Sequence, residues 1–310
     1  MRPKDRAEAE RLTAAIANYA EKVRPLLGLP NAAQVESLVE QMLESVHRVQ
    51  YVKVQLKRPH DPARADPDSD LFDPILGAIV QKSEGNLEEA AWLTFLSTHC
   101  GKHLNLGWRL SRLIYAGGGK RWTWKRLSAE PESFRVWVGK NQNQLAPDGH
   151  AGFGNHRKYE SLRPDSARPT GRVVESYAKW VIAAGSHQAL FDAVVIESGN
   201  DRGKAFDALY QRANALLGFG RMGRFDFLTM LGKLELANIE PAIPYVTGAT
   251  GPQAGARLLF YGNASAKVKV HVLDKIVAEF GQHLGLGMQV MEDSICNWQK
   301  SPGKFRAFRG

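Results

Sequence analysis

The chain has 310 residues, of which 44% are hydrophobic and 24% charged, which excludes wholesale disorder and favours one large or two smaller folded domains. Lysine and arginine total 41 against 32 acids, giving a formal net charge of +9. This excess favours a surface that binds a polyanion such as DNA, although a soluble protein can also be basic for other reasons. The two cysteines, Cys100 and Cys296, are too few for a four-cysteine zinc or iron–sulfur site, and we expect no metal and no cofactor.

Apolar residues recur at helical spacing along most of the chain. The segments with this spacing are 6–28, 33–57, 103–115, 172–184, 186–197 and 201–217. Asn86 is placed to cap a further helix, and the glycines at 117–119 are placed to end one. Residues 139–172 are typical of a loop because glycine, asparagine, proline and aspartate dominate. We therefore predict an all-α protein with a division near 139–172.

No segment has the features of a signal peptide or a membrane span. The N-terminus runs directly into a charged helical pattern. The longest apolar stretches, such as 173–184, are interrupted by charge and are shorter than the roughly 20 residues that a span needs. We expect a cytoplasmic protein that has no membrane partner.

The segment 245–259 is rich in glycine and has the pattern of two helices joined by a tight hairpin. In helix-hairpin-helix modules, glycines let the backbone approach a DNA phosphate, and the second helix offers its N-terminal N–H groups. An ordinary glycine turn between packed helices fits the pattern equally well. The candidate phosphate contacts are Gly251, Pro252, Gln253, Gly255 and Arg257.

Residues 153–159 place cations and aromatic rings in one short loop. Cations suit phosphates, and an aromatic ring can stack on an unpaired base. A solvated loop is the commoner role of such a run. The candidate DNA contacts of this loop and of the basic tail 300–309 are Asn155, His156, Arg157, Lys158, Tyr159, Lys300, Lys304 and Arg306.

Asp226 lies between Phe225 and Phe227 at the expected start of a helix. It could simply cap or border that helix. Alternatively, it is a partly desolvated carboxylate in an aromatic pocket, able to stabilise positive charge. Three other acids lie close to an aromatic residue or downstream of the glycine segment: Asp274, Glu292 and Asp293.

With these segments in this order, the sequence resembles the α-glutamyl/putrescinyl thymine pyrophosphorylase family. This family is similar to the helix-hairpin-helix DNA glycosylases and is known from phage thymine hypermodification and from bacterial antiphage glycosylases. The resemblance implies a glycosylase-like domain over 86–310, preceded by a helical region, 1–85, that carries no motif we recognise. It also implies a target nucleotide turned out of double-stranded DNA that carries modified bases. The segments that carry the resemblance are 153–162, 218–231, 251–257 and 291–300.

Together the resemblance and the acids predict a DNA N-glycosylase used in antiphage defence. It would excise a bulky modified base, such as glucosylated hydroxymethylcytosine or a hypermodified thymine, with Asp226 as the preferred catalytic acid and Asp293, Glu292 and Asp274 as alternatives. Bifunctional glycosylases of this fold place a lysine after the hairpin glycines, where this chain has Gln253, so we expect an abasic site in an unbroken strand. The aromatic residues expected around the base are Phe153, Phe225, Phe227 and Trp298.

Two other functions are compatible with the same residues. A base-modifying transferase would use the same flipped base and replace pyrophosphate on a modified thymine with an amine. A DNA-binding module without catalysis would need none of the acids. No Gly-Lys-Ser/Thr loop occurs, which argues against an NTPase.

Overall fold

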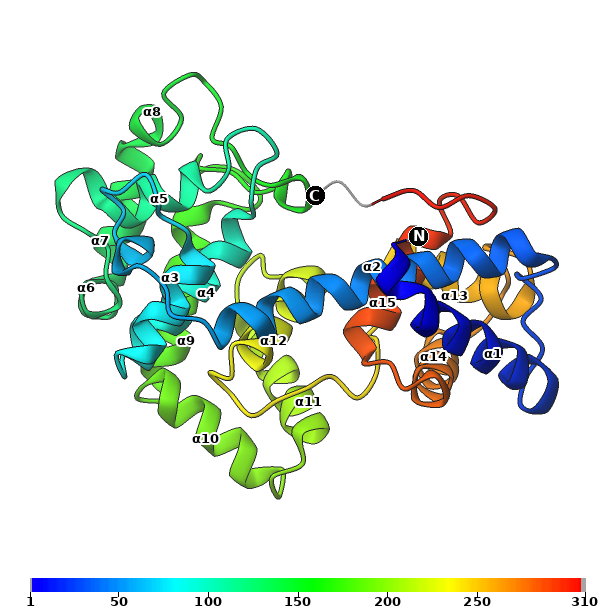
Figure 1. Ribbon diagram of the computed structural model, residues 1–310. Helices are drawn as coiled ribbons and strands as arrows, with labels where there is room; N and C mark the ends of the chain where they lie inside the picture. Colours follow the sequence, from blue (N-terminus) through cyan, green and yellow to red (C-terminus); the bar gives the residue numbers. More distant parts are fainter. Residues whose placement is uncertain (1, 308–310) are drawn as a thin grey trace. The chain divides into compact units, whose positions relative to one another are not determined.

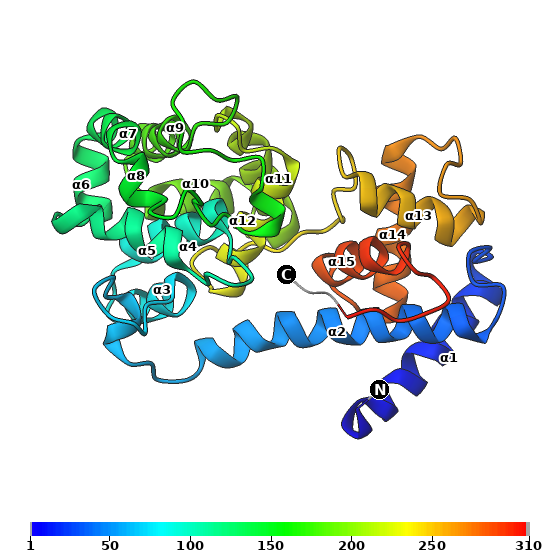
Figure 2. The same cartoon turned by 90° about the horizontal axis from the view of Figure 1, so that it is seen from above.

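The helices of the chain form two compact units. The structure is a computed structural model and describes residues 2–307. Within this range, residues 2–52 and 241–307 form what we call the terminal unit, and residues 53–240 form the central unit. In Figures 1 and 2 the terminal unit is blue and orange to red, and the central unit runs from cyan to yellow.

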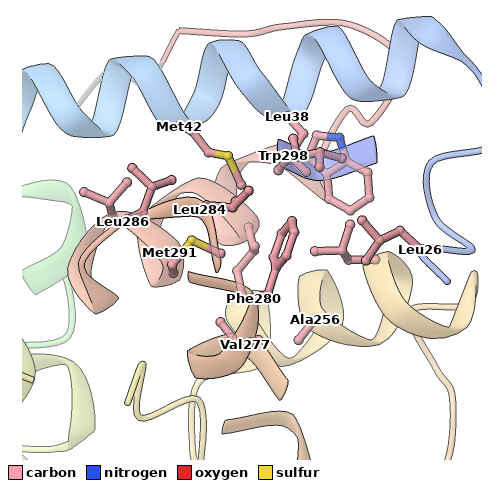
Figure 3. Close-up of a cluster of buried hydrophobic side chains, with 14 of the residues drawn as sticks. Leu26, Leu38, Met42, Ala256, Val277, Phe280, Leu284, Leu286, Met291 and Trp298 are labelled. Carbon is pink, nitrogen blue, oxygen red and sulfur yellow. The ribbon is translucent and has the colours of Figure 1, made fainter. Parts of the chain in front are cut away.

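The terminal unit joins segments from both ends of the chain in one helical core. Leu38 and Met42 on α2 pack into the same buried cluster as Phe280 on α14 and Trp298 on α15 (Figure 3). Burying each such side chain stabilises the fold by roughly 1.5–3 kcal/mol, so these contacts are what hold the two ends together. The helices of this unit are α1 (Arg6–Lys22), α2 (Ala32–Leu56) as far as Val52, α13 (Thr250–Tyr261), α14 (Val270–Leu284) and α15 (Met288–Trp298).

The central unit is built around α4 (Leu87–Cys100). Every residue of this helix from Glu89 to Cys100 is buried, as expected for a helix that neighbours cover on all sides. It contacts α3, α5, α6, α10 and α12. The remaining helices of the unit are α3 (Pro74–Ser83), α5 (Arg109–Ala116), α6 (Trp124–Ala129), α7 (Pro131–Lys140), α8 (Gln142–Leu145), α9 (Thr170–Ala183), α10 (His187–Glu197), α11 (Arg202–Arg212) and α12 (Arg221–Lys233).

The all-α prediction is confirmed, since residues 2–307 contain helices and only isolated β-bridges. Asn86 caps α4 as predicted, its side chain accepting the Glu89 N–H at 3.3 Å. Helix α5 ends at Gly117, which is left-handed (φ 64°). The helix expected from residue 103 begins only at Arg109, because residues 103–107 form a tight turn. No helix of the described chain is long and apolar enough to cross a membrane.

The two units divide the chain at other places than the sequence suggested. We expected a boundary after residue 85 and a division near 139–172. In the structure α3 and α4, on either side of residue 85, pack against each other, and so do α7 and α9, which flank the 139–172 loop. These contacts keep both junctions inside the central unit, whereas the terminal unit combines residues that are about 200 positions apart.

Candidate functional site

A glycine hairpin joins α11 to α12 in the central unit. Gly218 is left-handed (φ 66°), and Gly220 directly precedes the first turn of α12. Within the described residues no side chain caps that turn, and a Cβ added at Gly220 would meet nothing within 4 Å. Backbone N–H groups at an open helix start of this kind suit a phosphate. We did not predict this hairpin from the sequence, although a Gly-x-Gly pair between two helical segments signals it.

Asp226 lies in the second turn of α12 and forms an ion pair with Arg157. The Arg157 guanidinium donates from Nη2 to Asp226 Oδ2 at 2.6 Å and from Nε to the Thr98 carbonyl at 2.6 Å. The Arg157 side chain is only 10% exposed, whereas the Asp226 side chain is 42% exposed. A buried guanidinium bonded at both ends therefore fixes the orientation of a solvent-accessible carboxylate. The structure brings together two predicted site residues that are 69 positions apart.

His99 lies beside this pair but is fully buried. Burial, together with the charge of Arg157, lowers the pKa of His99 to about 3, so the ring is neutral at physiological pH. Its Nε2 lies 3.1 Å from the Thr170 hydroxyl, and its ring meets the edge of the half-buried Phe153. The neighbouring Cys100 is buried too, which raises the pKa of its thiol to about 12. These groups support the loop that carries Arg157.

The prediction of an aromatic pocket around Asp226 is wrong. Phe225 and Phe227 are 1% and 0% exposed and belong to the hydrophobic core. Phe225 packs on Phe206, and Phe227 packs edge-on to Phe95. On a helix, residues on either side of a position point away from it by about 100°, so both rings turn inward while Asp226 faces outward.

The other candidate acids lie in the terminal unit and have structural partners. Asp274 is buried and accepts the Val246 N–H at 2.7 Å, so it fixes the segment before α13. Asp293 pairs with Arg48 and accepts from Asn297 Nδ2 at 2.9 Å. Glu292 is half-buried on the same helix, α15. Trp298, expected in a base pocket, is fully buried in the core of this unit (Figure 3).

The prediction that a hairpin joins two helices at 245–259 is also wrong. No helix ends near residue 245, because α12 ends at Lys233 and α13 begins at Thr250. A Cβ at Gly251 would lie 2.7 Å from Cys296 Sγ, and one at Gly255 would lie 2.3 Å from the Ile295 carbonyl oxygen. These glycines therefore allow α13 to pack closely against α15. Of the other candidates here, Pro252 is buried, Arg257 is half-buried, and Gln253 donates to the Val246 carbonyl at 2.9 Å.

The remaining candidate DNA contacts are on the surface of their own unit. In the central unit, the candidates on the surface are Asn155, His156, Lys158 and Tyr159, the last with 71% of its area exposed. In the tail, Lys300, Lys304 and Arg306 are exposed. The Arg306 carbonyl accepts from Gln41 Nε2 at 2.8 Å, which attaches the tail to α2. The expected tail reached residue 309, and 308–310 lie outside the described residues.

A model of the alpha-glutamyl/putrescinyl thymine pyrophosphorylase clade 3 family matches residues 33–310. The chain belongs to this family. No curated protein and no solved structure gives a significant match. The match starts at residue 33, so it includes most of the region 1–85 in which we recognised no motif.

The name of this pyrophosphorylase family designates enzymes that act on modified thymine in DNA, which makes DNA the indicated partner. In this family member the exposed, oriented carboxylate of Asp226 lies on the helix that the glycine hairpin starts. Among residues 2–307, no group of three or more His, Cys, Asp or Glu side chains could hold a metal ion. The backbone at the start of α12 can bind a phosphate, and the carboxylate of Asp226 can stabilise positive charge and transfer a proton.

Proposed function

We propose that this family member is a DNA N-glycosylase that excises a bulky modified base and leaves an abasic site. The observation that carries the proposal is the exposed carboxylate of Asp226, held by the buried Arg157 on the helix that follows the glycine hairpin. Asp226 belongs to the same unit as the hairpin and the exposed loop 155–159, whereas Asp274, Asp293 and Glu292 do not. Membership of a family named for modified thymine supports a modified base as the target.

The proposed reaction breaks the bond between C1′ of the sugar and the nitrogen of the base. The bonding electrons leave with the base, and the sugar becomes an oxocarbenium-like cation. Asp226 Oδ2 is held by Arg157, while within the described chain Oδ1 makes no hydrogen bond and can face the cation. The carboxylate stabilises this charge and accepts a proton from the water that adds to C1′. The departing base takes up a proton from solvent at the nitrogen that lost its bond, and Asp226 later releases its own proton to solvent. The products are a free base and an abasic sugar in an unbroken strand.

Binding in this proposal depends on phosphates and on base flipping. The first turn of α12 would take a phosphate, and the surface cations would replace counterions around the duplex. The target must leave the stack, which costs a few kcal/mol. A bulky modification would supply extra polar contacts, and a site that requires them can reject the plain base by about four orders of magnitude. We expect the enzyme to meet such DNA in the cytoplasm, as a defence against phage.

The family's name favours a second function, that of a base-modifying transferase. It would act on a thymine that carries a pyrophosphate and let an amine displace that group. The bond between base and sugar would stay intact. The two reactions therefore differ in their products, a released base in one and a base of altered mass in the other.

The deciding experiment incubates the protein with duplexes that carry plain bases, glucosylated hydroxymethylcytosine or pyrophosphorylated thymine with an amine. Mass spectrometry follows released bases, and alkali cleavage follows abasic sites. We expect release from a modified duplex, reduced about 100-fold or more in Asp226→Asn. The control is Asp165→Asn, a carboxylate of the same unit with 69% side-chain exposure, and it should behave as the wild type.

Three other results would each replace the proposal. A thymine of altered mass without base release establishes the transferase. Binding of DNA without any chemical change establishes a DNA-binding module. Base release that survives Asp226→Asn shows that another residue supplies the carboxylate.

A further inference from the structure

The turn that follows α4 exposes a leucine to solvent at its apex. Leu104 is 78% exposed, more than any other large hydrophobic side chain in the described part of the chain. Exposing an aliphatic side chain of this size forgoes the stabilisation that its burial would give. A single exposed leucine is common on protein surfaces, so its support and its surroundings must decide whether it has a role.

The turn around Leu104 is held rigid by its own hydrogen bonds. His103 and Gly107 exchange two backbone hydrogen bonds, each 2.9 Å long. The Nδ1 atom of His103 accepts the N–H groups of Asn105 at 3.2 Å and Leu106 at 3.1 Å. These bonds hold the backbone in a shape that projects Leu104 outward, so its exposure is built into the turn.

This turn is anchored to the loop that carries Arg157. Gly154 donates its N–H to the Cys100 carbonyl at 2.8 Å. A Cβ at Gly154 would lie 3.0 Å from the Lys102 carbonyl oxygen, so the two backbones are in direct contact. Three residues along the same loop, Arg157 holds Asp226. The exposed leucine and the candidate catalytic carboxylate therefore share one rigid support.

The surroundings of the leucine suit a polyanion. Lys102 and Lys158 are exposed, with their ammonium groups 5.8 Å from the Trp108 ring and 5.2 Å from the Tyr159 ring. Neither segment 101–110 nor segment 149–159 contains an acidic residue. An apolar tip two residues from the exposed cation Lys102 suits a duplex, in which a stacked, apolar interior lies between two rows of phosphates.

We propose that Leu104 is a wedge that enters the base stack of duplex DNA and fills the space that the target base leaves. This inference rests on the proposed function and names the residue that would stabilise the flipped state. Apolar side chains, leucine among them, separate base steps in this way in other DNA-binding proteins. Because unstacking a base costs free energy, loss of the wedge should slow a reaction on duplex DNA by about tenfold or more. A single strand has no paired stack to open and should not need the wedge.

The test compares Leu104→Ala with Ile196→Ala, which removes an equally apolar side chain that is 73% exposed in the same unit. Base release is measured from one modified base in a duplex and in a single strand. A 2-aminopurine beside the target reports unstacking by its fluorescence, whether or not a base is released. We expect Leu104→Ala to lose about tenfold or more on the duplex, to keep its single-strand rate and to lose the fluorescence rise. Ile196→Ala should match the wild type.

Equal rates of wild type and Leu104→Ala on the duplex would overturn the wedge, and so would equal losses on both substrates. The fluorescence keeps this inference separate from the glycosylase proposal. If the wild type releases no base but unstacks the duplex, and Leu104→Ala does not, the wedge stands without the glycosylase. If the wild type binds the duplex without any fluorescence rise, there is no wedge.

Discussion

The starts of α12 and α13 look alike in sequence and differ in what their glycines do. At α12, the side of Gly220 where a Cβ would stand is open, and an added Cβ would meet nothing within 4 Å. At α13, Gly255 lies against the backbone of α15, where an added Cβ would be 2.3 Å from a carbonyl oxygen. A missing side chain can serve an approaching ligand or a neighbouring helix, and the sequence pattern is the same for both.

The acids that follow the two glycine segments differ in the same way. Asp226 on α12 keeps 42% of its side chain exposed and is oriented by Arg157. Asp274 on α14 is 6% exposed and holds the backbone of Val246. The central unit thus directs a glycine hairpin and a carboxylate toward solvent, whereas the terminal unit uses the same residue types inside its own packing.

Gly255→Val should destabilise the protein more than any other substitution considered below. The added side chain must push α13 away from α15, and we expect the free energy of unfolding to fall by about 3 kcal/mol or more. The same substitution at Gly220 meets no neighbour and should cost about 1 kcal/mol or less, through poorer helix capping. Urea denaturation followed by circular dichroism measures both. Equal losses at the two positions would show that Gly220 is packed as tightly as Gly255.

Acid should destabilise the central unit through His99. Its pKa is lowered to about 3 by burial, whereas an unfolded histidine titrates near 6.5, so the unfolded state takes up the proton first. Stability is therefore fully present above about pH 6.5 and falls as the pH drops toward 3, by about 1.4 kcal/mol per pH unit.

The check is the free energy of unfolding between pH 7.5 and pH 5. His99→Gln removes the titrating group, so its stability should come closer to that of the wild type as the pH falls. His283→Gln, at an exposed position of the terminal unit, should leave the slope unchanged. A wild-type slope that survives in His99→Gln would show that His99 is not the group that titrates.

On DNA binding we expect a moderate effect from Gly220→Val. A branched side chain at the hairpin would keep a phosphate away from the first turn of α12, and affinity for a duplex should fall about tenfold. Ala129→Val adds bulk at an exposed position of α6 and serves as the control. Fluorescence anisotropy with a labelled duplex gives the affinities. An unchanged affinity of a folded Gly220→Val protein would make this hairpin a packing feature like that of α13.

The smallest effect should come from Lys158→Ala. One lost phosphate contact should weaken binding a few-fold and reduce the slope of log affinity against log salt by about 0.9. Lys140→Ala removes the same charge from another exposed site of the central unit and should leave the slope as it is. A titration from low to physiological salt compares them. Equal slopes for the two variants would place Lys158 away from the DNA.

The fold class and many helix ends could be predicted from local sequence patterns. Helical spacing predicted the all-α structure, Asn86 predicted the start of α4, and Gly117 predicted the end of α5. Signals of this kind are local, because a helix depends on side chains three or four positions apart and on the residues that cap it. The family resemblance could likewise be read from segments in their order along the chain.

Which of these residues can form a site depends on how distant segments pack. The tertiary structure turned Phe225 and Phe227 into the core, buried Arg157 and paired it with Asp226 across 69 positions. It also placed α15 against the glycines of α13, so their missing side chains make room for a neighbouring helix. Burial and pairing depend on segments distant in the chain, so a local pattern cannot tell a glycine that meets a phosphate from one that meets a helix.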